Sequence, residues 1–338
     1  MGGIRLGGIK YLEGLAHLAV FSPARGILAG EACISRLAET GINLNLLTCT
    51  GEAAGEGSVV ACCMENEEGA DSYAALREES EKGATLTLQS DTAILSVFPY
   101  NKRAEIAGEL LAGMAREDVL PCAFASSPSS LSVVVGGPDR GKAAKALFHS
   151  FEFSSYASLQ DWHAAYRGKE HLLREIVASY RERMIKIYGV VAQRDLDLWS
   201  VPAGLDSMAP LGASLASLGA AGVKLPFLIA RPWGRNGLLF ELCFSTEDAE
   251  RVRRELEAHM PGASFRRRTS VAAFFIHGPH FGDRYGIADA LLGTLRKSHV
   301  IPLALGCAVS SISTVVCQED LESGLHALER AFEVPARQ

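Results

Sequence analysis

The sequence is poor in the features that mark several classes of protein. Its 338 residues carry no excess of positive charge, since Lys and Arg number 33 and Asp and Glu number 39, a net charge of −6. Nucleic acids and anionic membrane surfaces attract basic proteins, so neither is expected as a partner. No apolar run reaches the roughly 18 residues that would span a bilayer. The N-terminal residues also lack the apolar core of a signal peptide, which predicts a cytoplasmic protein.

Paired cysteines and the usual catalytic signatures are absent as well. None of the eight cysteines forms a C-x-x-C pair, and most stand in apolar runs such as 59–64, which is typical of reduced thiols in a hydrophobic core. The sequence contains no G-x-S-x-G turn, no H-E-x-x-H helix and no assignable Ser/His/Asp order. It therefore predicts no catalytic residues, no metal ligands and no cofactor. An enzyme is not excluded, but it would lack a recognisable nucleophile.

Three motifs resemble binding sites but have simpler explanations. The segment 136–142 resembles a phosphate-binding loop, but Ala143 replaces the hydroxyl residue that would bind Mg²⁺, so we interpret it as a turn that needs glycine. The two histidines and the aspartate within 277–283 lack a further ligand at zinc spacing, which favours a surface turn. The arginines 266–268 are typical of a solvated edge strand, with an anion site as the alternative.

An internal repeat decides the architecture that the sequence predicts. Many residues of the first half are similar to the residue that lies 181 positions later. Of the 17 residues from 119 to 135, eight are identical to their counterparts in the second half. The apolar stripe of a predicted helix over 103–116 survives the same shift, so both copies should pack in the same way. The duplication covers roughly 4–153 and 185–334. Such self-similarity indicates a fold built from repeated units.

Each copy divides again into two small units. In the first copy, strands and helices follow the order β-α-β-β-α-β over 16–89, and the order restarts at 93 with helices over 103–116 and 141–149. Split β-α-β motifs of this size predict an α+β fold of ferredoxin-like units. Residues 154–184 are predicted as a helical linker. The predicted units are 1–90, 91–153, 185–270 and 271–334.

The segment 21–52 has the chemistry of a site for a small zwitterion. A turn at 24–26 opens a predicted helix whose free N–H groups favour a carboxylate, and Gly26 lets the backbone come close to a ligand. Asn43 and Asn45 alternate onto one face of the next strand, where their carboxamides can accept hydrogen bonds from an ammonium group. A capped helix followed by a buried strand with polar ends explains the same residues equally well.

These residues resemble the tandem ACT-domain regulatory region of aspartokinases, the lysine-sensitive type most closely. The similar stretches are 25–29, 41–50 and 129–135, together with the lead-in at 8–11. The resemblance implies that residues 3–10 form a strand that completes the second unit rather than the first. The resemblance implies four ACT units in two tandem pairs, and a non-catalytic regulatory protein that binds a free amino acid as an allosteric sensor. The kinase domain that precedes this region in aspartokinases has no counterpart in the sequence, which implies that kinase activity is absent.

The resemblance also implies an effector site. Asn45 stands where lysine-sensitive enzymes have an aspartate, so a neutral amino acid is expected at least as much as lysine. The second copy has Lys224 and Pro226 at the positions of Asn43 and Asn45, which predicts a single competent site, in the first unit. The implied effector-binding residues are Phe21, Ala24, Gly26, Ile27, Leu28, Asn43, Leu44, Asn45 and Thr50.

The same resemblance bears on partners. In aspartokinases two chains pair their ACT units side by side, with effectors at the junction. The duplication therefore predicts an intramolecular pseudo-dimer, with unit one beside unit three and unit two beside unit four, and leaves further homodimerisation open. A metabolic enzyme would be the regulated partner. Two other functions stay open: a transferase or kinase-related enzyme with an unrecognised active site, and a ligand-free structural or partner-binding ACT array.

Overall fold

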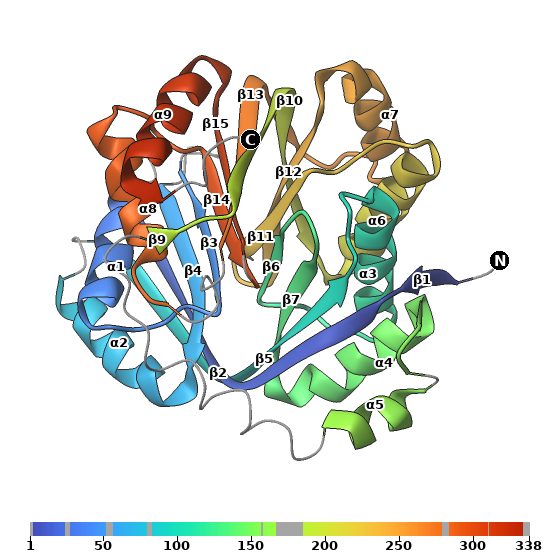
Figure 1. Ribbon diagram of the computed structural model, residues 1–338. Coiled ribbons are helices and arrows are strands. Elements are labelled where there is room, and N and C mark those ends of the chain that lie inside the picture. The colour runs from blue at the N-terminus through green and yellow to red at the C-terminus, as the bar shows by residue number, and fades with distance from the viewer. Residues whose placement is uncertain are drawn as a thin grey trace.

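Two groups of helices enclose the strands in the computed structural model (Figure 1). The chain mixes helices with a large antiparallel sheet, so the predicted α+β class is confirmed. None of the described helices is long and apolar enough to cross a membrane. The structure describes residues 3–23, 28–51, 57–79, 83–156, 158–166, 185–278, 284–309 and 311–333.

The first copy follows the predicted order of elements. Two of its strands are longer than predicted, because each joins stretches that the sequence patterns indicate as separate. The stretches predicted as separate strands over 85–89 and 93–98 form one continuous strand, β5. The elements are β1 (Ile4–Leu6), β2 (Gly8–Ser22), α1 (Leu28–Glu39), β3 (Leu46–Thr50), β4 (Ser58–Glu65), α2 (Asn66–Glu79), β5 (Thr85–Phe98), α3 (Ala104–Arg116), β6 (Ala123–Ser126), β7 (Leu131–Gly136), α4 (Arg140–Ser150) and β8 (Phe151–Phe153).

The second copy repeats this order. Between the copies, α5 (Leu159–Tyr166) lies within the predicted linker helix over 154–184, of which 167–184 lie outside the described residues. The remaining elements are β9 (Ile185–Lys186), β10 (Gly189–Gly204), α6 (Leu205–Ala220), β11 (Phe227–Trp233), β12 (Gly237–Ser245), α7 (Ala249–His259), β13 (Arg266–His277), α8 (Ile287–Lys297), β14 (Ala304–Ala308), β15 (Ser311–Cys317), α9 (Leu321–Ala331) and β16 (Phe332–Glu333).

The longer strands of the described chain close into a ring in the order β10-β12-β11-β6-β7-β5-β2-β4-β3-β14-β15-β13. Four of them, β2, β5, β10 and β13, have a neighbouring strand on both sides over only part of their length. In β5, Thr92–Val97 pairs with β7, whereas Thr85–Gln89 has only β2 beside it. Gly14 and Asp195, which correspond in the two copies, have φ angles of 72° and 56° and interrupt the ladders of β2 and β10. Irregularities of this kind bend a strand.

These bends turn the ring into two sheets that face each other, each backed by helices (Figure 1). Three hydrophobic clusters match this layering. One packs α3, α4, α6 and α7 against their sheet, and a second packs α1, α8 and α9 against the other. The third contains strand residues alone, among them Leu46, Ile229 and Val315, and fills the space between the sheets. The core is therefore divided into three layers rather than one.

The two copies join along two strand pairs, and here one prediction is wrong. Strand β3 of the segment predicted as unit one pairs antiparallel with β14 of unit four, with Thr50 opposite Ala304. Strand β6 of unit two pairs with β11 of unit three, with Ala125 opposite Ile229. The sequence analysis expected unit one beside unit three and unit two beside unit four. Each copy instead contributes one segment to each sheet.

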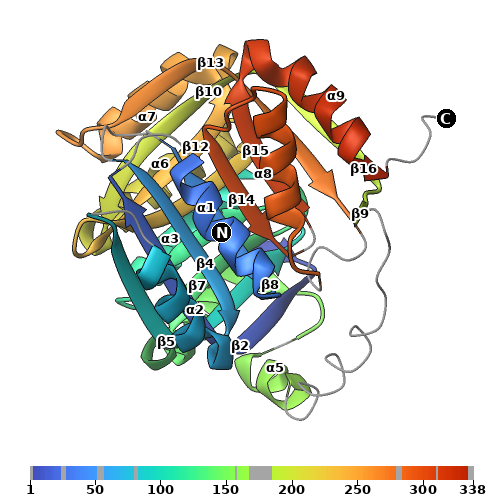
Figure 2. The same ribbon diagram turned by 90° about the vertical axis from the view of Figure 1, so that its left-hand side faces the viewer.

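Helix packing explains this choice of partners. The helices α3 and α6 cross at Gly108 and Gly212, where a Cβ at position 108 would lie 2.5 Å from the Gly212 carbonyl oxygen. Glycine is therefore required for this close approach of the two backbones. The 181-residue shift makes α8 and α1 the counterparts of α3 and α6, and these also lie side by side (Figure 2).

The α1–α8 contact has charged and polar residues where the α3–α6 contact has small ones. Gly108 corresponds to Asp289, and Gly212 to Glu31. The Ser35 hydroxyl donates to the Asp289 carboxylate, and Arg296 Nε lies 2.8 Å from Glu31 Oε1. Side chains of this size keep the two helices apart, so this junction is looser than its counterpart.

Candidate functional site

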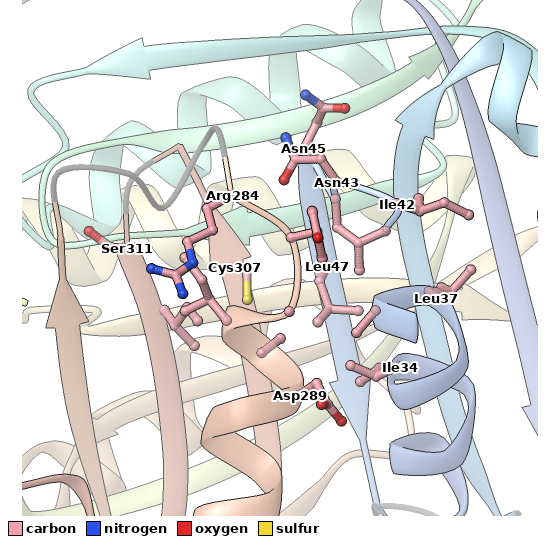
Figure 3. Close-up of a pocket in the computed structure, with 18 of the residues that line it drawn as sticks. Ile34, Leu37, Ile42, Asn43, Asn45, Leu47, Arg284, Asp289, Cys307 and Ser311 are labelled. Atoms are coloured by element: carbon pink, nitrogen blue, oxygen red, sulfur yellow. The ribbon is translucent and has the colours of Figure 1, made fainter. Parts of the chain in front are cut away.

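A hollow lies at the looser junction, between the end of α1, the start of β3 and the N-terminus of α8 (Figure 3). Residues of β14 and β15 form its remaining wall, so both copies contribute. Its volume is about 530 Å³ only when the open mouth and the adjoining solvent are counted. Water-sized groups have only about 40 Å³ inside, so an amino acid would also occupy the mouth.

The apolar part of the lining comes mostly from α1 and β3. Ile34 and Leu37 are 2% and 1% exposed, and Leu47 is fully buried. Cys307 adds a thiol whose pKa is raised by burial, so it stays protonated and is neither a nucleophile nor a metal ligand. These groups favour an apolar side chain in the centre of the hollow.

Asn45 supplies the main polar group. Its backbone N–H donates to the Cys63 carbonyl oxygen at 2.8 Å, which holds the residue beside β4. Its side-chain Oδ1 is buried, and no donor within the described part of the chain reaches it. A buried acceptor without a partner costs about 1–3 kcal/mol, so a ligand that donates a hydrogen bond to it gains this energy back.

The second copy adds charge of both signs. Arg284 and Tyr285 precede α8, and Gly286, with a φ angle of 81°, forms its N-cap without a side-chain hydrogen bond. The first N–H groups of such a helix lack partners in the helix and favour an anion. Figure 3 shows Asn45 on the upper side of the hollow and Asp289 on the lower side, with Leu47 and Cys307 between them. The hollow thus offers separate places for an ammonium and a carboxylate group.

Of the residues that the resemblance implies, three line this hollow: Asn43, Leu44 and Asn45. The sequence analysis expected the two asparagines on a strand, but β3 begins at Leu46, so both lie in the segment before it. Phe21 and Thr50 lie elsewhere, because both pair with Val59 at the far end of β4. Leu28 begins α1, but its side chain is outside the described part of the structure. Ala24, Gly26 and Ile27 also lie outside the described residues, so the set as a whole stays a prediction.

Sequence reasoning missed the lining from the second copy, notably Arg284, Tyr285, Asp289 and Cys307. These residues belong to the segment predicted as unit four, whereas the sequence analysis placed unit three beside unit one. The signal that identifies the true neighbours is the small-residue spacing in α3 and α6, which marks one junction and, through the repeat, its counterpart.

The corresponding region of the other junction is filled by protein. The Tyr100 hydroxyl donates to the Leu225 carbonyl oxygen at 2.9 Å, and the Leu225 N–H donates to the Lys102 carbonyl oxygen at 2.9 Å. Tyr100 is fully buried. Lys224 and Pro226, which the sequence analysis identified as incompatible with a ligand, flank this contact. Protein groups there occupy the position that a ligand would need.

Comparisons with known proteins identify the fold. No protein family matches the sequence, and no curated protein matches it. Among solved structures, aspartate kinase from Synechocystis matches with a TM-score of 0.78 and 15% identity, covering 97% of this chain and 56% of that one. The ligand-free regulatory subunit of aspartate kinase from Thermus thermophilus covers 44% of this chain with a TM-score of 0.39 and 17% identity, and 99% of its own length is matched. This chain has an aspartate-kinase-like fold.

The aspartate-kinase-like chain spans just over half the length of the Synechocystis enzyme that it matches. The segment that resembles a phosphate-binding loop has a structural explanation. Gly137, within the loop at 136–142, lies against Asp91, and a Cβ there would overlap that carboxylate. Arg140 bonds Glu13 Oε2 at 3.2 Å and Asp91 Oδ2 at 3.3 Å, which fixes the start of α4.

The first of the two histidines within 277–283 also has a structural role. His277 Nδ1 lies 3.0 Å from the Ser311 hydroxyl, and the ring packs against Tyr188. Residues 279–283, which include the second histidine and the aspartate, lie outside the described residues. Among the described side chains, no group of three or more could hold a metal ion.

Proposed function

We propose that this chain is a non-catalytic regulatory protein that binds a free amino acid in the hollow between α1 and α8. The Asn45 side chain carries the proposal, because its Oδ1 is buried and lacks a described donor in a hollow whose centre is apolar. An ammonium group would donate to this oxygen. The carboxylate would lie near Arg284, the one cation among the described lining residues.

The chemistry favours a neutral, apolar amino acid. Ile34, Leu37 and Leu47 would contact its side chain. Asp289 already accepts a hydrogen bond from Ser35, so it is less available to a second positive charge. Asn45 carries no charge to attract the side-chain ammonium of lysine. The neutral ligand expected from the sequence is therefore part of the same proposal.

The architecture that we propose is four ferredoxin-like ACT units in two tandem pairs, within an intramolecular pseudo-dimer. Its support is the strand order: β5-β2-β4-β3 is the order of a split β-α-β unit, and β13-β10-β12-β11 repeats it. The hollow lies between the two copies, so a ligand that prefers one relative orientation would shift the population toward it. A metabolic enzyme in the cytoplasm, expected from the sequence, would respond to that shift.

A thermal-unfolding screen against the twenty amino acids tests ligand binding. A ligand at about 100 times its Kd stabilises the folded protein by about 2.7 kcal/mol, which raises the melting temperature measurably. Replacing Asn45 by alanine removes the acceptor, so we expect binding to weaken by about ten- to a hundredfold. Pro226→Ala, the matched change at the corresponding position of the second copy, should leave the shift intact.

Two results would contradict the proposal: no amino acid raises the melting temperature, or Asn45→Ala binds as well as the unchanged protein. A further variant tests the orientation of the ligand. Asn45→Asp adds a negative charge beside the proposed position of the α-ammonium group, which every amino acid carries, so it should strengthen binding of the neutral ligand and of lysine alike. Isothermal titration of both variants with lysine and with the neutral ligand measures this change.

The whole-chain likeness to an aspartate kinase favours one alternative, an enzyme. We expect no turnover, because the sequence resemblance covers the regulatory region of aspartokinases and not their kinase domain. A coupled assay for ADP, with ATP and aspartate as substrates, checks this. ADP formation that depends on aspartate and is lost in Lys142→Ala would replace the regulatory proposal with a catalytic one.

A further inference from the structure

A second hollow lies beside the first residues of β13 and contains a concentration of positive charge. Water-sized groups have about 460 Å³ inside it, against about 40 Å³ in the first hollow. Arg266, Arg267 and Arg268 line it, together with His299 from the segment after α8. Gly51, at the end of β3, contributes from the first copy. Among its described lining residues, Asp320 is the one carboxylate. This excess of cations contrasts with the net charge of −6 of the whole chain.

Two of the three guanidinium groups are held in place. Arg267 bonds the fully buried Asp197 carboxylate at 2.7 Å and 2.9 Å, and its guanidinium lies over the Trp199 ring. Arg268 donates to Cys317 Sγ at 3.2 Å. No described carboxylate lies within ion-pair distance of Arg266. Because side chains alternate along a strand, Arg266 and Arg268 share the face of β13 that carries most of the charge of the hollow, whereas Arg267 is held on the other face by Asp197 and Trp199.

One acidic group, Glu241, lies behind the hollow. Ser200, which lines the hollow, donates to Glu241 Oε2 at 2.8 Å. Glu241 is fully buried between the sheets, and burial raises the pKa of its carboxyl to about 7, although Arg231 and Arg266 lower it. Around neutral pH this group is therefore only partly ionised and neutralises little of the charge of the arginines.

The fold does not require arginines here. The start of β13 has β10 alone beside it, since β15 pairs only with Val271–His277. The corresponding stretch of β5, Thr85–Gln89, likewise has β2 alone beside it, and it carries no charged side chain. A strand in this position thus remains paired and partly exposed without charge, so protection of the edge is not a sufficient reason for three arginines.

We propose that this second hollow binds a small polyanion, a molecule with two or more carboxylate or phosphate groups. Guanidinium groups bind both kinds of anion through paired hydrogen bonds, and the volume is suited to a small metabolite rather than a macromolecule. Because Gly51 belongs to the first copy and the arginines to the second, a bound polyanion would contact both. This site is separate from the amino-acid hollow and does not depend on it.

Isothermal titration of the full chain with inorganic pyrophosphate and with citrate tests the proposal, at about 0.15 M salt to screen weak surface binding. We expect at least one of the two to bind, and the comparison distinguishes phosphate from carboxylate ligands. Arg266→Gln with Arg268→Gln should weaken that binding about 100-fold, roughly tenfold for each arginine. Arg267 is left unchanged, because its loss would strand the buried Asp197.

Arg77→Gln with Arg116→Gln is the matched control, since it removes two exposed charges from α2 and α3. It should bind as the unchanged protein does. If the double variant in β13 fails to fold, Arg266→Gln alone is measured, because Arg266 has no described ion-pair partner. The proposal is overturned if neither anion binds, or if the β13 variant and the control lose the same amount of affinity.

Discussion

Glu241 is a buried carboxyl in the layer between the two sheets. It stands opposite Ile229 on neighbouring strands and accepts a hydrogen bond from Ser200. Burial raises its pKa to about 7, from a usual value of 4.5. Because the folded-state pKa is the higher one, the folded protein binds more protons than the unfolded chain between these two values. Its stability therefore falls as the pH rises through this range.

We predict that Glu241→Gln removes this fall. At pH 8 the variant should be more stable than the unchanged protein, by an amount on the order of 3 kcal/mol, and below pH 4.5 the two should differ little. His17 has the opposite effect: burial lowers its pKa to about 4, so it destabilises the fold as the pH falls below 6.5. The variant keeps His17, and a comparison of both proteins therefore isolates Glu241.

Urea unfolding at several pH values measures this difference. Glu78→Gln, an exposed carboxyl on α2, is the control and should keep the original pH profile. Equal profiles for Glu241→Gln and the unchanged protein would mean that the Glu241 carboxyl is solvated in solution.

At this scale the sequence identified part of the candidate site. Asn43 and Asn45 were recognisable as two amides beside an apolar run, although their predicted place on the strand was wrong, because β3 begins only at Leu46. Glu241 was not, since one carboxyl among apolar residues gives no sign of which layer it enters. The role of Arg267 was equally hidden, because its partner Asp197 lies 70 residues away in the chain.

At the scale of elements, the α3–α6 contact decides how the copies pair. Gly108→Ala places a methyl group 2.5 Å from the Gly212 carbonyl oxygen. We expect it to destabilise the protein by about 1–3 kcal/mol, because the helices must move apart. Gly293→Ala on α8 is the matched control: it has open space for the methyl group, and the better helix former should stabilise the fold by about 0.5–1 kcal/mol.

Chemical denaturation of both variants measures these two changes. Equal stability of Gly108→Ala and the unchanged protein would show that α3 and α6 are not in close contact. In that case helix packing would no longer explain why the segment predicted as unit one lies beside unit four, although the observed strand pairs would not be affected.

Most helices and strands were predictable from sequence patterns, but their partners were not. The periodicity of α3 and the β-branched run of β7 are local signals, and both elements occur where they were expected. The outer strands β3, β6, β11 and β14 are alike in being short and apolar, so any two can pair plausibly. The continuity of β5 was also hidden, because Asp91 adopts a φ angle of 55° within a stretch that reads as a turn.

At the scale of the whole molecule, the two copies are held together by both strand pairs and both helix contacts. We predict that cutting the chain leaves them associated. A protease site inserted between residues 175 and 176 should give two fragments on a denaturing gel and one particle of about the original mass under native conditions. Separation of the fragments under native conditions, without denaturant, would contradict the two shared junctions.

The exchange of partners between the copies also has a consequence for symmetry. In a dimer of two identical copies, the α1–α8 and α3–α6 junctions would be one surface used twice, so every substitution would alter both. In a single duplicated chain each junction has its own sequence. Here one has become tight and lined by glycine, and the other charged and hollow. The α3–α6 junction can therefore stay fixed while the α1–α8 junction changes when the proposed ligand binds.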